Sequence, residues 1–174
     1  MLELLRSDGN ILGEMVAVAL VVGPAVLAAW GMRRAYLRRR ASEESTVGPL
    51  PRIPEPDRAP DGQALYTGTT YGGSRARRLA AHGLFGRGPC RYWLERDRLV
   101  FQRLRGPVTS VRDVCKVGLT GAHAGRVLAP RRIAVIAWRL GDTEVDTGFA
   151  FDDAAMAEAF AQRVAAVTGS HVAS

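Results

Sequence analysis

An uninterrupted apolar run near the N-terminus is the clearest pattern in the chain. Residues 15–32 read MVAVALVVGPAVLAAWGM and contain no charged side chain. About 18 residues at about 1.5 Å each come close to the hydrocarbon core of a bilayer, which is about 30 Å thick. Ile11, Leu12 and Gly13 lengthen the run, and Pro24 is compatible with it because membrane helices tolerate proline. The pattern predicts a single transmembrane helix.

Basic residues follow this run immediately, whereas the N-terminal flank offers only Arg6 against Glu3 and Asp8. Arginine and lysine in short flanks stay on the cytoplasmic side of a membrane. We therefore expect the N-terminus outside and everything after Met32 inside, with residues 1–40 forming flank, anchor and juxtamembrane segment. The arginines that set this topology are Arg33, Arg34, Arg38, Arg39 and Arg40.

Three other interpretations of the apolar run fit less well. A cleaved signal peptide carries its positive charge before the run and a small-residue site after it, but here the charges follow and the exit reads Trp30-Gly31-Met32. A buried core helix or an amphipathic surface helix requires a polar stripe, and residues 16–29 have none. The anchor remains the favoured hypothesis.

Residues 41–63 form a segment of different composition, ASEESTVGPLPRIPEPDRAPDGQ. Five of the nine prolines fall here, mixed with acidic and small residues. Such a segment buries too little apolar surface to offset the entropy of ordering, and its prolines keep it extended. At about 3.1 Å per residue it would hold the following domain tens of ångströms from the bilayer. We predict a flexible linker.

After the linker the apolar period changes to two, which is typical of strands. Gly141-Asp142 predicts the strongest hairpin, and Glu95 to Asp97 indicates another turn. On the last strand Val145, Thr147, Phe149 and Phe151 should share one face. The predicted strands cover residues 64–71, 91–94, 99–104, 111–119, 132–140 and 143–151.

An amphipathic helix should close the chain. Asp152 or Asp153 can cap it, Gly169 can end it, and its apolar face is predicted from the spacing of four residues. These four are Met156, Phe160, Val164 and Val167. Residues 64–169 are thus predicted to form a mainly-β domain, a small antiparallel barrel or sandwich of about seven strands covered by a C-terminal helix.

The formal net charge of +7 arises almost entirely from arginine, since Lys116 is the only lysine. A basic balance can indicate nucleic acid or an anionic membrane face, but a GC-rich genome enriches arginine without any such selection. We expect no nucleic-acid partner. The two cysteines, Cys90 and Cys115, lack a metal or redox spacing; in the cytoplasm we expect reduced thiols, each a small buried hydrophobe.

Candidate catalytic chemistry is weak. Asp146-Thr147-Gly148 matches the aspartic-protease triplet, but it occurs once, and Asp146 is more simply the outward residue of an alternating strand. Three histidines, His82, His123 and His171, share no ligand spacing. Residues 118–125 are glycine-rich without a phosphate-loop Lys-Ser/Thr, which favours a flexible inter-strand loop. We predict no enzyme activity, no cofactor and no metal.

Three stretches of the sequence resemble a known family. They are residues 64–71 (ALYTGTTY), 81–84 (AHGL) and 138–149 (WRLGDTEVDTGF). They resemble small actinobacterial single-pass membrane proteins with a cytoplasmic pleckstrin-homology-like (PH-like) domain, and the resemblance covers nearly the whole chain. That family is often labelled export or transporter protein and is associated with pyrimidine-biosynthesis loci. The resemblance implies a PH-like fold and a membrane location, and it supplies no catalytic residues.

A basic segment follows the first predicted strand, where PH folds commonly hold anionic headgroups. Guanidinium groups suit phosphate because they form bidentate hydrogen bonds. The same residues could instead be a solvated surface or contact a protein partner, and the sequence leaves the three alternatives open. The candidate contact residues are Arg75, Arg77, Arg78 and Arg87.

We expect a membrane-anchored binding or scaffold module with an unknown protein partner at the inner face of the plasma membrane. A tethered domain needs no lipid recruitment, which favours protein binding over the alternative of an anionic-lipid-binding domain. A subunit of a transport or export complex is the other alternative, but one span forms no pathway alone. Small residues at Ala19 and Gly23, and at Ala25 and Ala29, would permit an oligomer.

Overall fold

The computed structural model describes residues 2–104 and 106–173, and it divides into two compact units, Met1–Arg39 and Arg40–Ser174. Helix α1 (Leu2–Val47) accounts for the first unit and contributes its last turns to the second. Within the described residues, one stretch, Gly13–Val47, is long and apolar enough to cross a membrane, and its apolar window is not buried in the protein. The predicted apolar helix is therefore confirmed.

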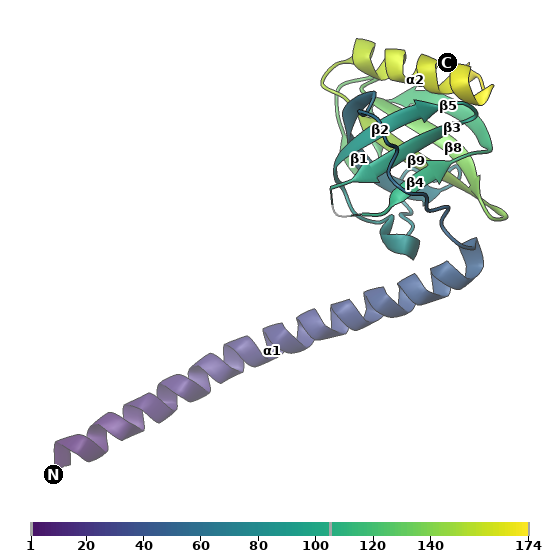
Figure 1. Cartoon of the computed structure of the whole chain (residues 1–174). Helices are drawn as coiled ribbons and strands as arrows, with labels where there is room; N and C mark the ends of the chain where they lie inside the picture. Colours follow the sequence, from purple (N-terminus) through teal and green to yellow (C-terminus); the bar gives the residue numbers. More distant parts are fainter. Residues whose placement is uncertain (1, 105, 174) are drawn as a thin grey trace. The chain divides into compact units, whose positions relative to one another are not determined.

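The second unit is mainly β, as predicted (Figure 1). Eight described strands form one curled sheet in the order β10-β5-β8-β9-β1-β2-β3-β4, antiparallel except for β10 on β5, while β6 and β7 form a separate hairpin. The strands are β1 (Gly62–Tyr71), β2 (Gly88–Glu95), β3 (Arg98–Arg103), β4 (Val108–Val111), β5 (Val114–Thr120), β6 (Ala122–His123), β7 (Arg126–Val127), β8 (Ile133–Leu140), β9 (Thr143–Ala150) and β10 (Val172–Ala173).

Strand β1 joins the two halves of this sheet because it changes partners along its length. Its first half, from Gly62 to Tyr66, pairs with β2, and its second half pairs with β9 up to Tyr71. The register shifts between Tyr66 and Gly68, where Gly68 adopts a φ of +128°. Only glycine reaches that conformation without strain, and such a bulge bends the strand. Gly68 therefore allows the sheet to curl.

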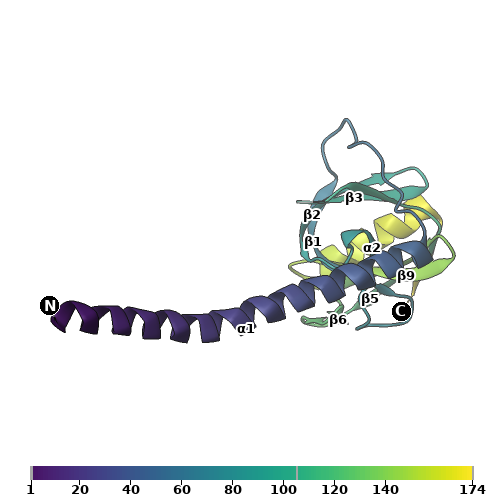
Figure 2. The same cartoon turned by 90° about the horizontal axis from the view of Figure 1, so that it is seen from below.

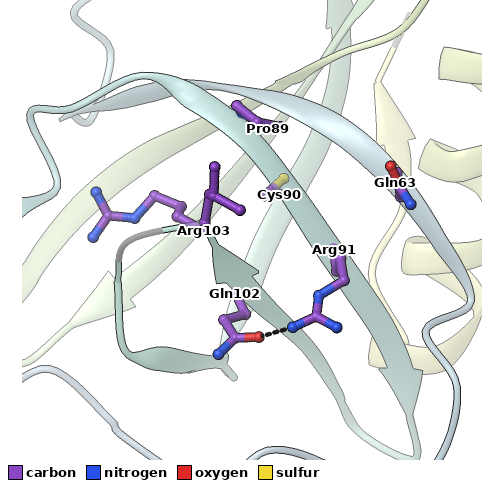
Figure 3. A pocket seen from close by; sticks show the side chains of 7 residues that line it. Gln63, Pro89, Cys90, Arg91, Gln102 and Arg103 are labelled. Atoms are coloured by element: carbon purple, nitrogen blue, oxygen red, sulfur yellow. Dashed lines mark hydrogen bonds between the residues drawn. The ribbon is translucent and has the colours of Figure 1, made fainter.

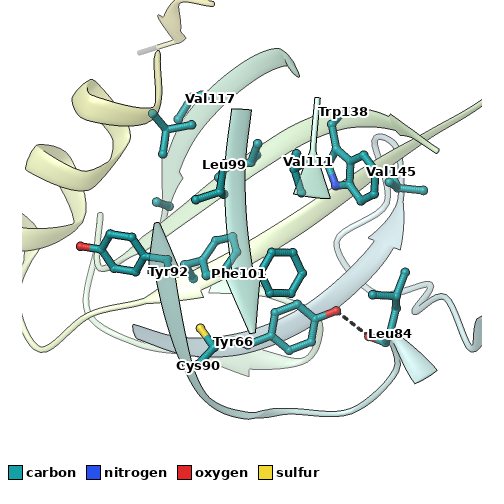
Figure 4. Packing of buried hydrophobic residues seen from close by; sticks show 14 of the residues in the cluster. Tyr66, Leu84, Cys90, Tyr92, Leu99, Phe101, Val111, Val117, Trp138 and Val145 are labelled. Atoms are coloured by element: carbon teal, nitrogen blue, oxygen red, sulfur yellow. Dashed lines mark hydrogen bonds between the residues drawn. The ribbon is translucent and has the colours of Figure 1, made fainter. Parts of the chain in front are cut away.

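Aromatic side chains fill the centre of the curled sheet. The ring centroid of Tyr66 lies 5.6 Å from that of Phe101, and Phe149 lies 5.4 Å from both Phe101 and Phe160. Figure 4 shows the Tyr66 ring among these residues, with its hydroxyl directed at Leu84. Offset and edge-to-face aromatic contacts of this kind add to the stabilisation from burial.

Helix α2 (Ala154–Thr168) packs on β2, β3, β5 and β8 and covers one end of the sheet (Figures 1 and 2). Its start is capped as predicted, because the Asp153 carboxylate accepts a hydrogen bond from the Met156 N–H at 2.7 Å, and Gly169 follows its last residue. Phe160 and Val164 are buried as expected, but Met156 is 48% exposed. The predicted face was wrong there: Ala157 and Ala161 line the core instead.

The segment predicted as a flexible linker, residues 41–63, is ordered against the domain. Helix α1 continues through it to Val47, and Val47 and Leu50 are buried. Beyond them Pro51 O accepts from Ser110 N at 3.0 Å, which covers the free edge of β4, and Trp93 Nε1 donates to Arg58 O at 3.0 Å. Burial of the few apolar residues therefore overrides the disorder-promoting composition, and β1 already begins at Gly62.

Two further expectations differ from the structure. Residues 111–119 form parts of two strands, β4 and β5, because Asp113 has a φ of +51° and interrupts the extended backbone. This division and the additional strand β10 explain why the sheet has eight strands where six strand ranges were predicted. Residues 118–125 are a strand end followed by the β6–β7 turn, not a flexible loop. Asp is among the few non-glycine residues that adopt positive φ readily.

His123 fastens the β6–β7 hairpin to the sheet. Its Nδ1 lies 2.9 Å from Thr67 Oγ1 and its Nε2 lies 3.3 Å from Thr70 Oγ1, and the residue is only 3% exposed. The ring sits directly on Gly148, where an added Cβ would meet Nδ1 at 2.3 Å. Burial lowers the pKa of His123 to about 4, so the imidazole is neutral and makes one donated and one accepted hydrogen bond.

Phe160→Ala should destabilise the domain by about 3–5 kcal/mol, the usual range for a buried aromatic. Phe160 is 2% exposed and contacts Tyr92 and Phe151 at ring separations of 4.7 and 5.0 Å. The matched control is Met156→Ala on the exposed face, which should lower stability by less than about 1 kcal/mol. Denaturant unfolding of the full chain measures both, and equal losses would contradict this helix orientation.

His123 predicts a pH dependence of stability. The pKa of His123 is about 4 in the folded chain, against an ordinary value of 6.5. Between pH 6.5 and about pH 4, the unfolded chain therefore binds a proton at this ring and the folded chain does not. The full contribution of the neutral ring to the free energy of unfolding is present above pH 6.5. This contribution is lost as the pH falls through the window, and the loss is about 2 kcal/mol at pH 5. Denaturant midpoints at pH 7 and pH 5 measure it; the fall should be smaller in His123→Gln, and an unchanged fall would refute the assignment.

Candidate binding surfaces

The basic segment between β1 and β2 lies against the domain and is not a mobile loop. Its backbone is bonded to β1: Leu79 N donates to Thr69 O at 2.8 Å, and Thr69 N donates to Leu84 O at 3.2 Å. Leu79 and Leu84 are fully buried, and the segment contains a short 3-10 turn, η1 (Ala81–Gly83). These contacts hold the backbone of the segment between Leu79 and Leu84 against the domain.

The structure does not bring the four predicted contact arginines together. Arg77 lies over the Tyr71 ring at 4.3 Å, and Arg78 lies over Phe85 at 4.4 Å while donating to Thr67 O at 3.2 Å. Partial burial lowers the pKa of Arg78. The Arg78 guanidinium group is thus partly buried, whereas Arg77 is exposed and lies on the Tyr71 ring at the surface.

Arg75 and Arg87 instead line two different cavities. Arg87 lines a cavity of about 360 Å³, which we call the arginine pocket. Its Nη2 donates to the Ala124 carbonyl, which belongs to the β6–β7 turn. The principal lining residues of this pocket are Gly83, Gly86, Arg87, Gly88, Arg103 and Leu104.

Arg103, at the end of β3, is the second cation of the arginine pocket. Its Nη1 donates to Gly83 O at 2.6 Å, and its guanidinium lies 5.2 Å from the centre of the Tyr66 ring. A neighbouring pocket of about 240 Å³ shares Arg103 and Leu104 (Figure 3). There Arg91 donates to Gln102 Oε1 at 2.7 Å, while the Arg103 side chain extends away from that pair.

A second cavity, of about 300 Å³, lies on the outer face of β5, β8 and β9, and we call it the β5 groove. The strand register aligns Lys116 with Ala137 and Ala137 with Asp146, while Gly118 pairs with Val135. Strands are about 4.8 Å apart, so Lys116 and Asp146 are attached roughly 10 Å apart with only a methyl group between them. The small residues leave open space between opposite charges.

Cations dominate the rim of the β5 groove. Neither Arg75 nor Lys116 makes a side-chain hydrogen bond or ion pair with the residues that the structure describes. Asp146 accepts from Gly73 N at 3.0 Å, and burial raises the pKa of its carboxyl group. Asp146 thus points to the outer face, as its strand position predicts.

A carboxylate clasp joins the end of α1 to the 80–82 turn. Glu43 Oε2 accepts from the backbone N–H groups of Ala80 and Ala81, the latter at 3.2 Å, and Glu44 Oε1 accepts from His82 N at 2.8 Å. His82 Nε2 lies 2.6 Å from Gly48 O and therefore donates to that carbonyl. These contacts fix the residues that follow Arg40 to the barrel.

Other groups with potential chemistry lie apart. The described residues contain no group of three or more His, Cys, Asp or Glu that could hold a metal ion. Cys90 is buried as expected, and its burial raises the pKa of its thiol to about 12. Cys115 is exposed, contrary to prediction, because the register shifts between Val114 and Lys116.

Sequence reasoning missed the most important surface residues. Arg103 was correctly assigned to a strand, but its place in a pocket was not predicted, and Leu104 lies just beyond the strand end and is 80% exposed. The available signal was an apolar residue shortly before Gly106-Pro107, a dipeptide that predicts a turn. Lys116 stood out as the only lysine, yet no local pattern placed it beside Arg75.

Comparison with known proteins agrees with this architecture. The model of a family described as "Bacterial PH domain-like" matches residues 46–165. That match includes most of the segment predicted as a linker, in keeping with its packing on the domain. No curated protein and no solved structure matches the chain. The chain belongs to the bacterial PH domain-like family.

Proposed function

We propose that this chain is a single-pass plasma-membrane protein whose PH-like domain lies in the cytoplasm and binds a protein partner there. The apolar helix and the arginines after Met32 support the anchor and its orientation, since such clusters stay inside. PH-like domains are generally binding modules without catalytic activity, and an anchored binding domain acts as a scaffold.

The β5 groove is the observation that carries the protein-binding role. Its cations, Arg75 and Lys116, stand beside a floor of small residues that an extended chain can approach closely. An acidic side chain seated between them gains two charge-assisted contacts. Asp146, at the other end of the row, can accept a hydrogen bond from a neighbouring polar group of the same segment. The partner is therefore a protein that presents an exposed extended segment with an acidic residue.

The orientation predicts that a reporter fused after Ser174 is cytoplasmic. Protease added to intact spheroplasts should leave the domain intact, and the mature protein should retain residues 1–32 because the helix is an anchor. Mass determination checks the retention. Digestion in intact spheroplasts would overturn the orientation, and loss of residues 1–32 would identify a signal peptide.

Neutralising the five juxtamembrane arginines should give a mixed orientation, because the charge bias that holds the C-terminal side inside is lost. The changes are Arg33→Gln, Arg34→Gln, Arg38→Gln, Arg39→Gln and Arg40→Gln. The matched control replaces five other arginines of the domain surface with glutamine, which should leave the reporter cytoplasmic. Equal reporter signals in both sets would show that these arginines do not set topology.

The groove predicts a specific crosslink. Cys115 does not line the groove, but it is exposed and next to Lys116 in the chain, whereas Cys90 is buried. A thiol-directed photo-crosslinker with a flexible spacer, attached to Cys115 without any substitution, can therefore reach a partner in the groove. In native membranes it should yield a discrete adduct with one protein. Arg75→Ala combined with Lys116→Ala should reduce that adduct by about tenfold, the factor that corresponds to about 1.4 kcal/mol.

The matched control is Arg112→Ala, which removes an exposed arginine outside the groove. It should leave the adduct unchanged, and the mass spectrum of the adduct should contain an acidic segment of the partner. An adduct of equal yield in all three proteins would contradict the groove as the partner site.

A further inference from the structure

We propose that β10 is a displaceable strand on the edge of β5, and that a segment of the partner replaces it there. This inference deepens the proposed function and rests on it in one respect, that the partner presents an extended acidic segment. It adds how that segment is held, by backbone pairing with β5. It also names the competitor, which is the chain's own tail, residues 170–173.

The pairing of β10 with β5 is short. Among the described residues it joins Val172 to Val117 and Ala173 to Gly118, whereas β5 is seven residues long. It is also the parallel pairing in a sheet whose other described pairings are antiparallel, and parallel pairs are slightly less stable per residue. Two residues at the margin of the sheet can therefore separate while the other pairings stay intact.

Side chains hold the tail only lightly. Val172 is 37% exposed, and His171 is exposed and makes no side-chain hydrogen bond or ion pair with the residues that the structure describes. Helix α2 does not depend on the tail, because its last turn is closed at Gly169, whose N–H donates to Ala165 O. The tail can leave β5 without unfolding α2.

The opposite edge of the sheet, β4, is closed in a different way. Ser110 N donates to Pro51 O at 3.0 Å and Ile53 N donates to Val108 O at 3.4 Å. Ile53 also packs against the cluster that contains Trp93, so apolar contacts hold this covering segment in place. An edge without such a cover is a template for a strand from another chain. The edge of β5 is therefore the place where a strand can be added.

Lys116 favours an acidic strand at this edge. Continuing the register of β10 by one residue places His171 opposite Lys116, and neighbours across paired strands share a face of the sheet. Lys116 and Gly118 line the β5 groove, so the residues opposite them lie on the groove side. An imidazole never carries a negative charge, whereas Asp or Glu in this position forms an opposite-charge pair across the strands. An acidic segment of the partner fits this edge better than the tail does.

Amide hydrogen exchange of the full chain in phosphatidylcholine nanodiscs tests whether the tail opens. Val117 N donates to His171 O at 3.2 Å. This amide should exchange at least about tenfold faster than amides at the centre of β8 and β9, because marginal elements open with smaller free energies than core strands. His171→Asp should slow the exchange of Val117 by about threefold, the effect of one cross-strand opposite-charge pair. The control His171→Asn should leave it unchanged, and so should His171→Asp in a Lys116→Gln chain.

A peptide tests the replacement of the tail. The probe is a synthetic peptide of residues 168–173 carrying His171→Asp, and the receptor is the chain shortened after Gly169. The peptide should slow the exchange of Val117, and the unchanged peptide should require about three times its concentration. The full chain should require at least about ten times more peptide than the shortened chain, because its own tail competes as an intramolecular strand. Lys116→Gln should remove the difference between the two peptides.

Two outcomes would overturn the proposal. One is exchange of Val117 in the full chain as slow as that of β8 and β9, and the other is an equal peptide requirement for the full and shortened chains. The thermal midpoint shows whether the shortened chain is folded; if it is not, His171→Asp and His171→Asn in the full chain decide alone. None of these measurements involves the partner. A missing Cys115 adduct therefore refutes the partner site while these results stand, and slow exchange of Val117 refutes the displaceable strand while the adduct persists.

Discussion

The hydroxyl group of Tyr66 is a polar atom in the middle of an aromatic core, and the surface around the barrel end depends on how it is satisfied. A buried hydroxyl without a partner is costly. Tyr66 donates to the carbonyl of Leu84 and lies 2.8 Å from Thr69 Oγ1, which in turn lies 2.9 Å from Thr147 Oγ1. This network ties the long β1–β2 connection to the core at Leu84. The connection then presents η1 to the carboxylates of α1 on one side and the glycines around Arg103 on the other.

The carboxylate clasp determines how the segment after the apolar helix is held. Three backbone N–H groups of the 80–82 turn lack partners in the barrel itself, and Glu43 and Glu44 accept from them. The chain then continues along the domain and buries Leu50, instead of providing a long spacer. The residues that follow Arg40 therefore belong to the folded domain.

Sequence reasoning succeeded where a local pattern determines the structure. The β8–β9 hairpin follows from period two and Gly141-Asp142, and α2 follows from its cap at Asp153. It failed where distant contacts decide. Val47, Leu50, Ile53 and Pro56 are among the less exposed residues of the proline-rich segment and recur at every third position, with Val47 still in α1. The period of three can be seen in the sequence, but the surface against which these residues pack cannot be predicted from it. Likewise, the sequence does not distinguish Arg77 and Arg78 from Arg87, because no local pattern predicts the aromatic ring that lies under each of the first two.

The same reasoning separates the arginines that matter for binding from those that composition alone explains. In a chain with 24 basic residues, clustering along the sequence carries little information. What distinguishes a guanidinium is whether the fold already satisfies it. Arg58 and Arg91 have carboxylate partners, and Arg78 and Arg103 each donate to a backbone carbonyl and lie over an aromatic ring. Arg75 and Lys116 line the β5 groove without a side-chain hydrogen bond or ion pair among the described residues, although Asp146 lines the same groove. Arg75 and Lys116 are therefore cations that the fold leaves available to a partner at the β5 groove.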